Sequence, residues 1–319
     1  MSYIYIILFT QLFVVASGNN NWKKFQQFVE DHKKRYNTIE EFITRFNVFE
    51  DNVKYIEKVN QGGFNYTLGI NKFADMKTGE FFTKGLEFPK RKCDPYKVTE
   101  SSVPLSLDWR EHNAVTSVKD QGQCGSCWSF STTGAVEGAW AINKGKLESL
   151  SEQQLIDCSK SYGNHGCNGG LMDSAFNYII DSGICSEEDY PYTATSDNEC
   201  ESCKSVVSLS ECKDVSANNE EDLLQAVAMN PVSVAIEADT RVFQMYKSGV
   251  ITGDSCGTNL DHGVLVVGYG EEDGVLYWLV KNSWSSSWGM DGYVKIERST
   301  STNDPGVCGI AMQPSFPVV

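Results

Sequence analysis

The 319-residue sequence has only four histidines, and it lacks basic tracts. Lys and Arg number 27 against 42 Asp and Glu, a formal net charge of −15. This balance argues against a nucleic-acid partner, because phosphate binding requires a basic surface. Beyond the N-terminal residues, no stretch reaches the roughly 18 apolar residues of a membrane-spanning helix. With 41% hydrophobic residues, the chain can still form a sizeable core in one or two domains.

The N-terminus carries one short apolar run, from Ile4 to Val15, followed by the small residues Ala-Ser-Gly. This pattern is typical of a secretory signal peptide, which we predict over residues 1–17. The secretory pathway permits disulfides, so the 11 cysteines are candidates for bridges rather than metal ligands.

The charge changes sign along the chain. Residues 1–102 carry 15 Lys and Arg against 12 Asp and Glu, whereas residues 103–319 carry 12 against 30. A linker rich in Lys, Pro and Ser precedes the change. The two segments could be separately solvated surfaces, or they could form a clamp that is tightest when the carboxylates are ionised. We place a domain boundary between residues 102 and 103.

Apolar residues recur every three or four positions between Asn21 and Asn60, which predicts two amphipathic helices. One stripe of the second helix contains Glu41, Arg45, Phe49, Asn52, Ile56 and Asn60. From the residues alone, this is an ordinary core stripe with a capping pair.

The segment after residue 103 predicts a helical half followed by a β half. Helical spacing covers residues 127–143, 152–158 and 172–181. Beyond Pro231 the runs PVSVAIEA, HGVLVVGYG, LYWLVKNSW and GYVKIER are rich in Val, Ile and Tyr and predict strands. The EEDG turn favours antiparallel pairing, so the fold class is α+β.

Cys127 lies where the loop QGQCGS meets the first turn of the predicted helix. The positive end of a helix dipole favours a thiolate, which makes this residue a candidate nucleophile. The alternative is a redox or zinc pair of Cys124 and Cys127, but no second CxxC or His pair at zinc spacing accompanies it.

His262 begins one predicted strand and Asn282 ends the next. Each is ten residues from position 272, so a hairpin centred there would set them opposite each other on one face. The Asn amide would orient the imidazole toward Cys127. A lone His at a strand start is more often structural than catalytic. Trp284, which follows Asn282, could shield the His–Asn hydrogen bond from water or simply fill the core. Gln121 could donate a hydrogen bond to a developing oxyanion.

The motifs QGQCGSCWSF, DHGVLVVGYG and KNSWSSSWGMDGY resemble the papain family of cysteine proteases, in particular its cathepsin L-like branch. The stripe from Glu41 to Asn60 and GINKFAD resemble the family's prosegment motifs, and LSLDWR resembles its mature N-terminus. The resemblance implies a two-lobed enzyme, with a helical lobe and an antiparallel β-barrel-like lobe, over residues 103–319. An inhibitory helical propeptide would cover residues 18–102.

The resemblance implies a cysteine endopeptidase with nucleophile Cys127, acid/base His262, orienting amide Asn282 and oxyanion donor Gln121. It needs no metal or organic cofactor. The implied substrate-binding positions are Gly169, Gly170, Leu171, Met172, Ala235, Leu260, Asp261, Gly263, Trp284 and Gln313. Most are apolar, which favours Leu, Phe or Val two residues before the scissile bond. Gln313 stands where a small residue is typical, so some polar or basic side chains are expected there.

The resemblance also implies three disulfides: Cys124–Cys167, Cys158 with Cys200 or Cys203, and Cys256–Cys308. With Cys93 of the prosegment set aside, Cys185, Cys212 and one of Cys200 and Cys203 remain. We expect them to give one further bridge and one free thiol.

The partners that follow are polypeptide substrates, the chain's own propeptide as inhibitor and cystatin-like protein inhibitors, with a monomeric enzyme. Acid is expected to trigger processing, in a lysosome-like compartment or outside the cell. Two other classes stay open: an inactive homologue that only binds, and a secreted thiol oxidoreductase, which would need Cys124 and Cys127 both free.

Overall fold

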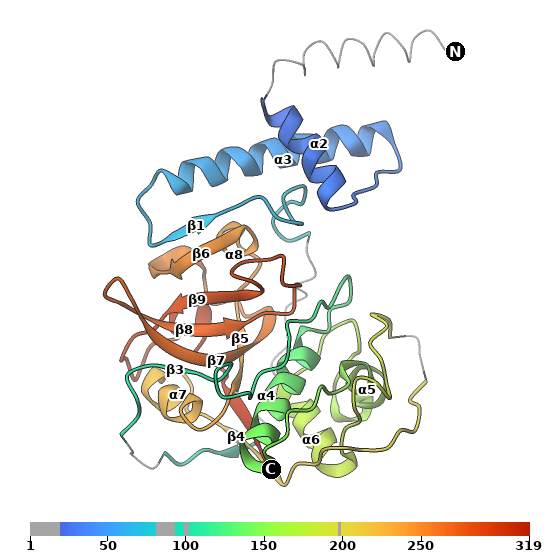
Figure 1. The fold of residues 1–319 in the computed structure, drawn as a ribbon, viewed down its shortest axis with the longest axis vertical. Helices are drawn as coiled ribbons and strands as arrows, with labels where there is room; N and C mark the ends of the chain where they lie inside the picture. The colour runs from blue at the N-terminus through green and yellow to red at the C-terminus, as the bar shows by residue number, and fades with distance from the viewer. Residues whose placement is uncertain (1–19, 81–92, 99–101, 197–198) are drawn as a thin grey trace.

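The computed structural model describes residues 20–80, 93–98, 102–196 and 199–319. The predicted signal peptide lies outside these ranges. The prosegment helices form one end of the molecule, above a body with a sheet on one side and helices on the other (Figure 1). This is the α+β, two-part architecture expected from the sequence.

The prosegment contains α2 (Asn20–Asp31), α3 (Ile39–Asn60) and β1 (Tyr66–Leu68). Thr38 caps α3 by accepting a hydrogen bond from the Glu41 N–H, 3.0 Å away. Phe25 and Phe28 of α2 pack against Phe49 of α3 with ring centroids 5.0–5.1 Å apart. The two expected helices therefore form, and their apolar stripes face each other.

Three helices and a short 3-10 turn build the helical lobe: α4 (Cys127–Lys144), α5 (Glu152–Cys158), η1 (Lys160–Tyr162) and α6 (Met172–Ser182). Gly145 ends α4 in the left-handed conformation, with φ 72°. Gly134 lets α4 approach the sheet, because a Cβ there would lie 2.7 Å from the Leu265 side chain.

The remaining elements form the sheet and its short helices. They are β2 (Asp94–Pro95), β3 (Leu107–Asp108), β4 (Glu211–Asp214), α7 (Glu220–Val227), β5 (Val232–Ile236), α8 (Arg241–Gln244), β6 (Tyr246–Ile251), η2 (Gly253–Ser255), β7 (His262–Glu272), β8 (Val275–Lys281), β9 (Tyr293–Glu297), η3 (Val307–Gly309) and β10 (Ser315–Val318). The strand order is β1-β6-β9-β8-β7-β5-β10-β4-β2, with β3 on β7. The prosegment thus adds strands to both ends of this order.

The β7–β8 hairpin forms, but its register differs from our expectation. The loop is Asp273–Gly274, both with positive φ, so the hairpin is not centred on residue 272. Near the loop Glu272 pairs with Val275. If this register continued along the strands, Asn282 would lie opposite Leu265, and its side chain would be on the other face from His262. A bulge between Val266 and Gly268 corrects this. His262 and Asn282 then share a face, offset by two residues rather than directly opposite.

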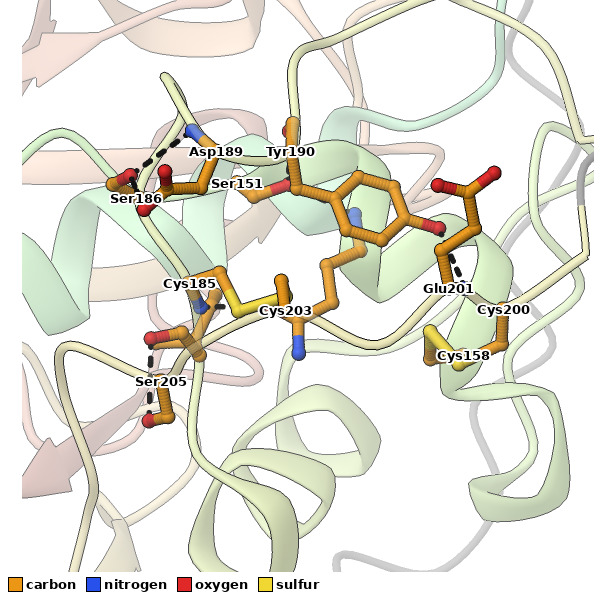
Figure 2. The surroundings of a disulfide bond; sticks show 12 residues. Ser151, Cys158, Cys185, Ser186, Asp189, Tyr190, Cys200, Glu201, Cys203 and Ser205 are labelled. Carbon is orange, nitrogen blue, oxygen red and sulfur yellow. Dashed lines mark hydrogen bonds between the residues drawn. A yellow bond between two sulfur atoms is a disulfide. The ribbon is translucent and has the colours of Figure 1, made fainter.

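The structure forms five disulfides among the described residues. Three are Cys124–Cys167, Cys158–Cys200 and Cys256–Cys308. Figure 2 shows the fourth, Cys185–Cys203, beside Cys158–Cys200. Tyr190 lies above both, and its hydroxyl accepts a hydrogen bond from the Glu201 N–H.

The expectation of a leftover free thiol besides Cys127 is wrong. The fifth bridge joins Cys93 of the prosegment to Cys212 of β4. We had set Cys93 aside as a prosegment residue, but its segment pairs with β4 and brings the two Cα atoms to 5.1 Å. Cys127 is the free cysteine in the described part of the chain.

Candidate active site

Cys127 is the first residue of α4, and only 3% of its surface is exposed. The backbone N–H groups of Trp128 and Gly263 favour the ionised form of its sulfur. Gly263 directly follows His262 at the start of β7, and a Cβ on Gly263 would lie 3.3 Å from the Trp128 nitrogen, so the helix start and the strand start are in contact. Glycine suits this position because a Cβ would lie only 3.2 Å from the Trp128 Cα.

Burial shifts the pKa of both groups. It raises the pKa of Cys127 to about 11, despite the two N–H donors. Burial lowers the pKa of His262 to about 4, opposed by the hydrogen bond with Asn282. Desolvation in the closed site therefore opposes the thiolate that the helix dipole would favour.

His262 is fully buried, and its Nε2 lies 2.8 Å from Asn282 Oδ1. Since Asn282 Oδ1 can only accept, this pairing places the imidazole proton on Nε2. Nδ1 has no hydrogen-bond partner in the described structure and is left as an acceptor. The Trp284 ring covers the imidazole at a centroid distance of 4.8 Å, and Phe243 lies 6.4 Å away.

Gln121 is also fully buried, and three neighbours hold it in place. Its Nε2 donates to the Cys124 carbonyl at 2.9 Å, and Ser283 Oγ donates to its Oε1 at 2.7 Å. Tyr192 donates its hydroxyl to the Gln121 carbonyl at 2.7 Å. One side-chain N–H hydrogen remains beyond the bond to Cys124. Ser283 and Tyr192 were missed by the sequence analysis, because each acts only through a long-range contact.

The predicted pocket residues divide into three groups. Met172, Ala235 and Leu260 belong to one buried apolar cluster with Trp128, and Gly263 contacts Met172 and Trp128. Leu171, Gln313 and Gly169 are partly exposed, whereas Gly170 is buried against Trp128, whose ring lies 2.6 Å from the place of a Cβ.

The side chain of Asp261 is directed at the loop after β5. Its carboxylate accepts the N–H groups of Ala238 and Asp239 at 2.8 and 3.2 Å. Burial raises its pKa to about 7. These bonds indicate that Asp261 fixes the loop after β5 and thereby the start of β7.

The prosegment packs directly on the aromatic cover of His262. Phe73, from GINKFAD, is 1% exposed and meets Trp284 edge to face at 5.0 Å. Asn71 donates its Nδ2 hydrogen to the Gln244 carbonyl at 2.7 Å. Lys72 pairs with Asp120 at 2.9 Å, next to Gln121. The prosegment thus reaches the Trp284 ring that covers His262 and the segment that carries Gln121.

A buried ionic cluster behind the site was not predicted from the sequence. Lys119 Nζ lies 2.6 Å from Glu152 and 3.3 Å from Glu137. Thr133 donates to Glu152 at 2.6 Å, and Lys281 donates to Thr116 at 2.9 Å. The two lysines adjoin the segments of Gln121 and Asn282 in sequence, so the cluster ties those segments to α4 and α5.

One group of potential metal ligands lies within the described residues: Cys93, Asp173 and Asp214. The sulfur of Cys93 is bonded to Cys212, so this group does not offer a free thiolate. None of the described helices has the length and apolarity to span a bilayer.

Family models match both parts of the chain. Residues 103–318 match "Papain family cysteine protease", and residues 25–81 match "Cathepsin propeptide inhibitor domain (I29)". The chain belongs to the papain family of cysteine proteases. It is a cathepsin L-like peptidase with an inhibitory propeptide, as the sequence motifs indicated.

Curated relatives and solved proform structures of similar proteins support this family assignment. The chain is 47% identical to "Thiol protease SEN102" of Hemerocallis, over 95% of this chain and 88% of that one. It is 47% identical to "Probable cysteine protease RD21C" of Arabidopsis thaliana, over 92% and 67% of the two chains. The digestive procathepsin L 3 of Tenebrio molitor superimposes with a TM-score of 0.86 at 45% identity, over 94% of this chain and all of that one.

These findings establish a cysteine endopeptidase made as an autoinhibited zymogen. The rival thiol oxidoreductase hypothesis fails because Cys124 is bonded to Cys167, which leaves no dithiol with Cys127.

Proposed function

We propose that this protease cleaves peptide bonds with Cys127 as nucleophile, His262 as acid and base, Asn282 as orienting amide and Gln121 as oxyanion donor. The observation that carries the proposal is the convergence of a free cysteine at the start of α4 with a buried His262–Asn282 pair at the start of β7. The described residues offer this nucleophile and base together at one place.

The reaction would start when the prosegment leaves and water reaches the cleft. Desolvation then weakens, so the proton of Cys127 can pass to His262 Nδ1 and form a thiolate beside an imidazolium. The thiolate attacks the substrate carbonyl. The Gln121 side chain and the Cys127 N–H would donate to the oxyanion. His262 protonates the leaving amine, and water then hydrolyses the acyl-enzyme.

The test is an assay of acidified proenzyme with dipeptidyl-Arg fluorogenic amides that carry Leu, Phe or a polar residue two positions before the bond. We expect hydrolysis by the native chain, preference for Leu or Phe, and covalent labelling by an epoxysuccinyl inhibitor. Cys127→Ala should lose the covalent labelling, and its hydrolytic activity should be at least about 10³-fold lower. A correctly processed, folded native enzyme that neither hydrolyses nor reacts would contradict the proposal.

Cleavage near residues 102 and 103, in a secretory or acidic compartment, would break the backbone between propeptide and mature enzyme. The enzyme freed of its propeptide would be a monomer sensitive to cystatin-like inhibitors. Gln313, at the expected pocket floor, would admit some polar side chains. A Gln313→Ala variant with unchanged selectivity across the substrate series would contradict that role.

Acid should loosen the prosegment at Glu80, whose carboxylate accepts hydrogen bonds from Arg45 and the Lys77 N–H. Burial alone would raise the pKa of Glu80, but these two donors outweigh it and lower the pKa. A lowered pKa means that Glu80 stabilises the prosegment above its unfolded pKa of about 4.3. That contribution is lost as the pH falls through the lower, folded pKa.

We therefore expect Glu80→Gln proenzyme to mature several-fold faster than native proenzyme near pH 6, and the two rates to converge only as the pH falls below about 4. Maturation rates on gels between these pH values measure the effect. Glu30→Gln removes an exposed prosegment carboxylate and should leave the native profile unchanged. Identical profiles for Glu80→Gln and native proenzyme would rule out this acid trigger.

A further inference from the structure

The disulfide between Cys93 and Cys212 joins the two parts of the chain that proteolysis is proposed to separate. Cys93 precedes the boundary at residues 102 and 103, and Cys212 lies 119 residues further on, in β4. Each of the other four bridges joins two cysteines beyond residue 103. This bridge alone among them crosses the boundary.

The segment around Cys93 is built into the sheet. β2 pairs in parallel with β4, and the Tyr96 N–H donates to the Asp214 carbonyl at 2.7 Å. The Tyr96 ring packs edge to face on Phe316 of β10, with centroids 5.2 Å apart. Cys212 is 4% exposed, whereas Cys93 is partly exposed. Backbone pairing and ring packing therefore hold Cys93 beside its partner.

This attachment lies far from the inhibitory contacts. In Figure 1, β4 is at the end of the body opposite α2 and α3. The prosegment is thus anchored at two distant places, non-covalently at the aromatic cover of His262 and covalently at β4.

We propose that Cys93–Cys212 is a covalent latch that retains the propeptide on the enzyme after cleavage at the mature N-terminus. The proposal rests on the cleavage position proposed above. A cut between residues 102 and 103 leaves the inhibitory helices linked to the mature enzyme. Their release then needs either thiol reduction of the latch or a second cut before Cys93.

The latch would raise the effective concentration of the inhibitory helices at the active site. A tethered segment has an effective concentration on the order of mM. In enzyme diluted to about 10 nM, this exceeds the concentration of a free propeptide roughly 10⁵-fold. Dilution and acid, which would release a free propeptide, would therefore be much less effective on the latched form.

Opening the latch is a two-electron exchange with a low-molecular-weight thiol as the reductant. A thiolate attacks Cys93 Sγ, because Cys93 is the more exposed residue of the two, and Cys212 leaves as a thiolate that takes up a proton. A second thiolate attacks the mixed disulfide, which frees Cys93 and yields the oxidised reductant. Asp173 and Asp214 lie within 4.8 Å of the Cys93 sulfur, and their charge would slow an anionic attacker.

The experiment separates the latch from the proposed catalysis by using the inactive Cys127→Ala proenzyme. A Factor Xa recognition sequence inserted between Pro104 and the exposed Leu105 provides one defined cut after Cys93. The cut protein is analysed without reductant by denaturing gel and intact mass. Portions treated or not treated with dithiothreitol at mildly alkaline pH, where the reductant forms thiolate, are then diluted at acidic pH and passed over a size-exclusion column.

Latched protein should run as one species with the mass of the whole chain plus one water, and dithiothreitol should divide it into two fragments. The variant that adds Cys93→Ser and Cys212→Ser should give two fragments without reductant and release most of its propeptide on the column. A matched control with Cys185→Ser and Cys203→Ser lacks a bridge inside the mature part and should behave as latched protein.

Two fragments from latched protein on the non-reducing denaturing gel would overturn the bridge. Equal propeptide release on the column by latched and Cys93→Ser/Cys212→Ser protein would overturn its retaining role. Neither outcome depends on Cys127 chemistry. Failure of the latch is thereby distinguishable from failure of the proposed catalytic mechanism.

Discussion

Replacing His262 by Ala is expected to lower kcat/KM of the matured enzyme by roughly 10³–10⁴-fold, the upper part of the range for a general acid and base. The imidazole has two tasks in the proposed reaction. It accepts the Cys127 proton to make the thiolate, and it returns a proton to the leaving amine. Without it, the thiol keeps a pKa near or above its ordinary value, and the amine must leave unprotonated. Steady-state hydrolysis of a fluorogenic dipeptidyl amide measures the loss.

The control variants separate chemistry from folding. His112 is exposed and stacks edge to face on Trp109 at 5.4 Å, so His112→Ala should keep nearly native activity. Asn282→Ala should cost less than His262→Ala, because it leaves the imidazole present but loses the 2.8 Å bond that fixes the proton on Nε2. Folded His262→Ala enzyme with more than a tenth of native activity would exclude the proposed acid and base.

The β7–β8 hairpin shows which features could be predicted from the sequence and which could not. Strand identity and the pairing of β7 with β8 followed from alternating apolar residues and a turn signal, both of which are local. The register was not predicted, because it depends on the loop at Asp273–Gly274 and on a bulge before Gly268. The bulge restores the strand face that the shifted loop would have changed. The predicted His262–Asn282 contact is nevertheless present. An offset of two residues preserves the face of a strand, and long side chains reach diagonal neighbours.

Residues that act through distant partners were not predictable. Lys119 and Glu152 look like ordinary surface charges in sequence, and only the packing of α4 and α5 buries them as a pair at 2.6 Å. Ser283 and Tyr192 hold Gln121 through partners more than 70 residues apart. The Cys93–Cys212 bridge was not predicted, for a different reason. Cysteine counting assumed that prosegment and mature cysteines pair separately, whereas the sheet extends across that boundary.

Replacing Phe73 by Ala is expected to raise the reactivity of Cys127 in the uncleaved proenzyme at neutral pH by roughly 10²–10³-fold. Phe73 is the prosegment side chain that packs on Trp284, the cover of His262. A buried Phe→Ala substitution costs about 3–5 kcal/mol. Here that cost falls on the closed state, in which prosegment and enzyme are packed together. The open state exposes Phe73 and loses little, so its population rises by about tenfold per 1.4 kcal/mol.

The rate of Cys127 labelling by an epoxysuccinyl inhibitor, in proenzyme kept at neutral pH, measures that open population directly. Phe64→Ala is the matched control, because Phe64 is a prosegment aromatic residue that is 53% exposed, and its loss should leave labelling unchanged. Phe73→Leu should fall between Phe73→Ala and the native chain, since it restores part of the buried apolar area. If Phe73→Ala labels no faster than Phe64→Ala, the contact with Trp284 does not hold the prosegment over the site. Inhibition would then depend on the Asn71 and Lys72 contacts with the enzyme.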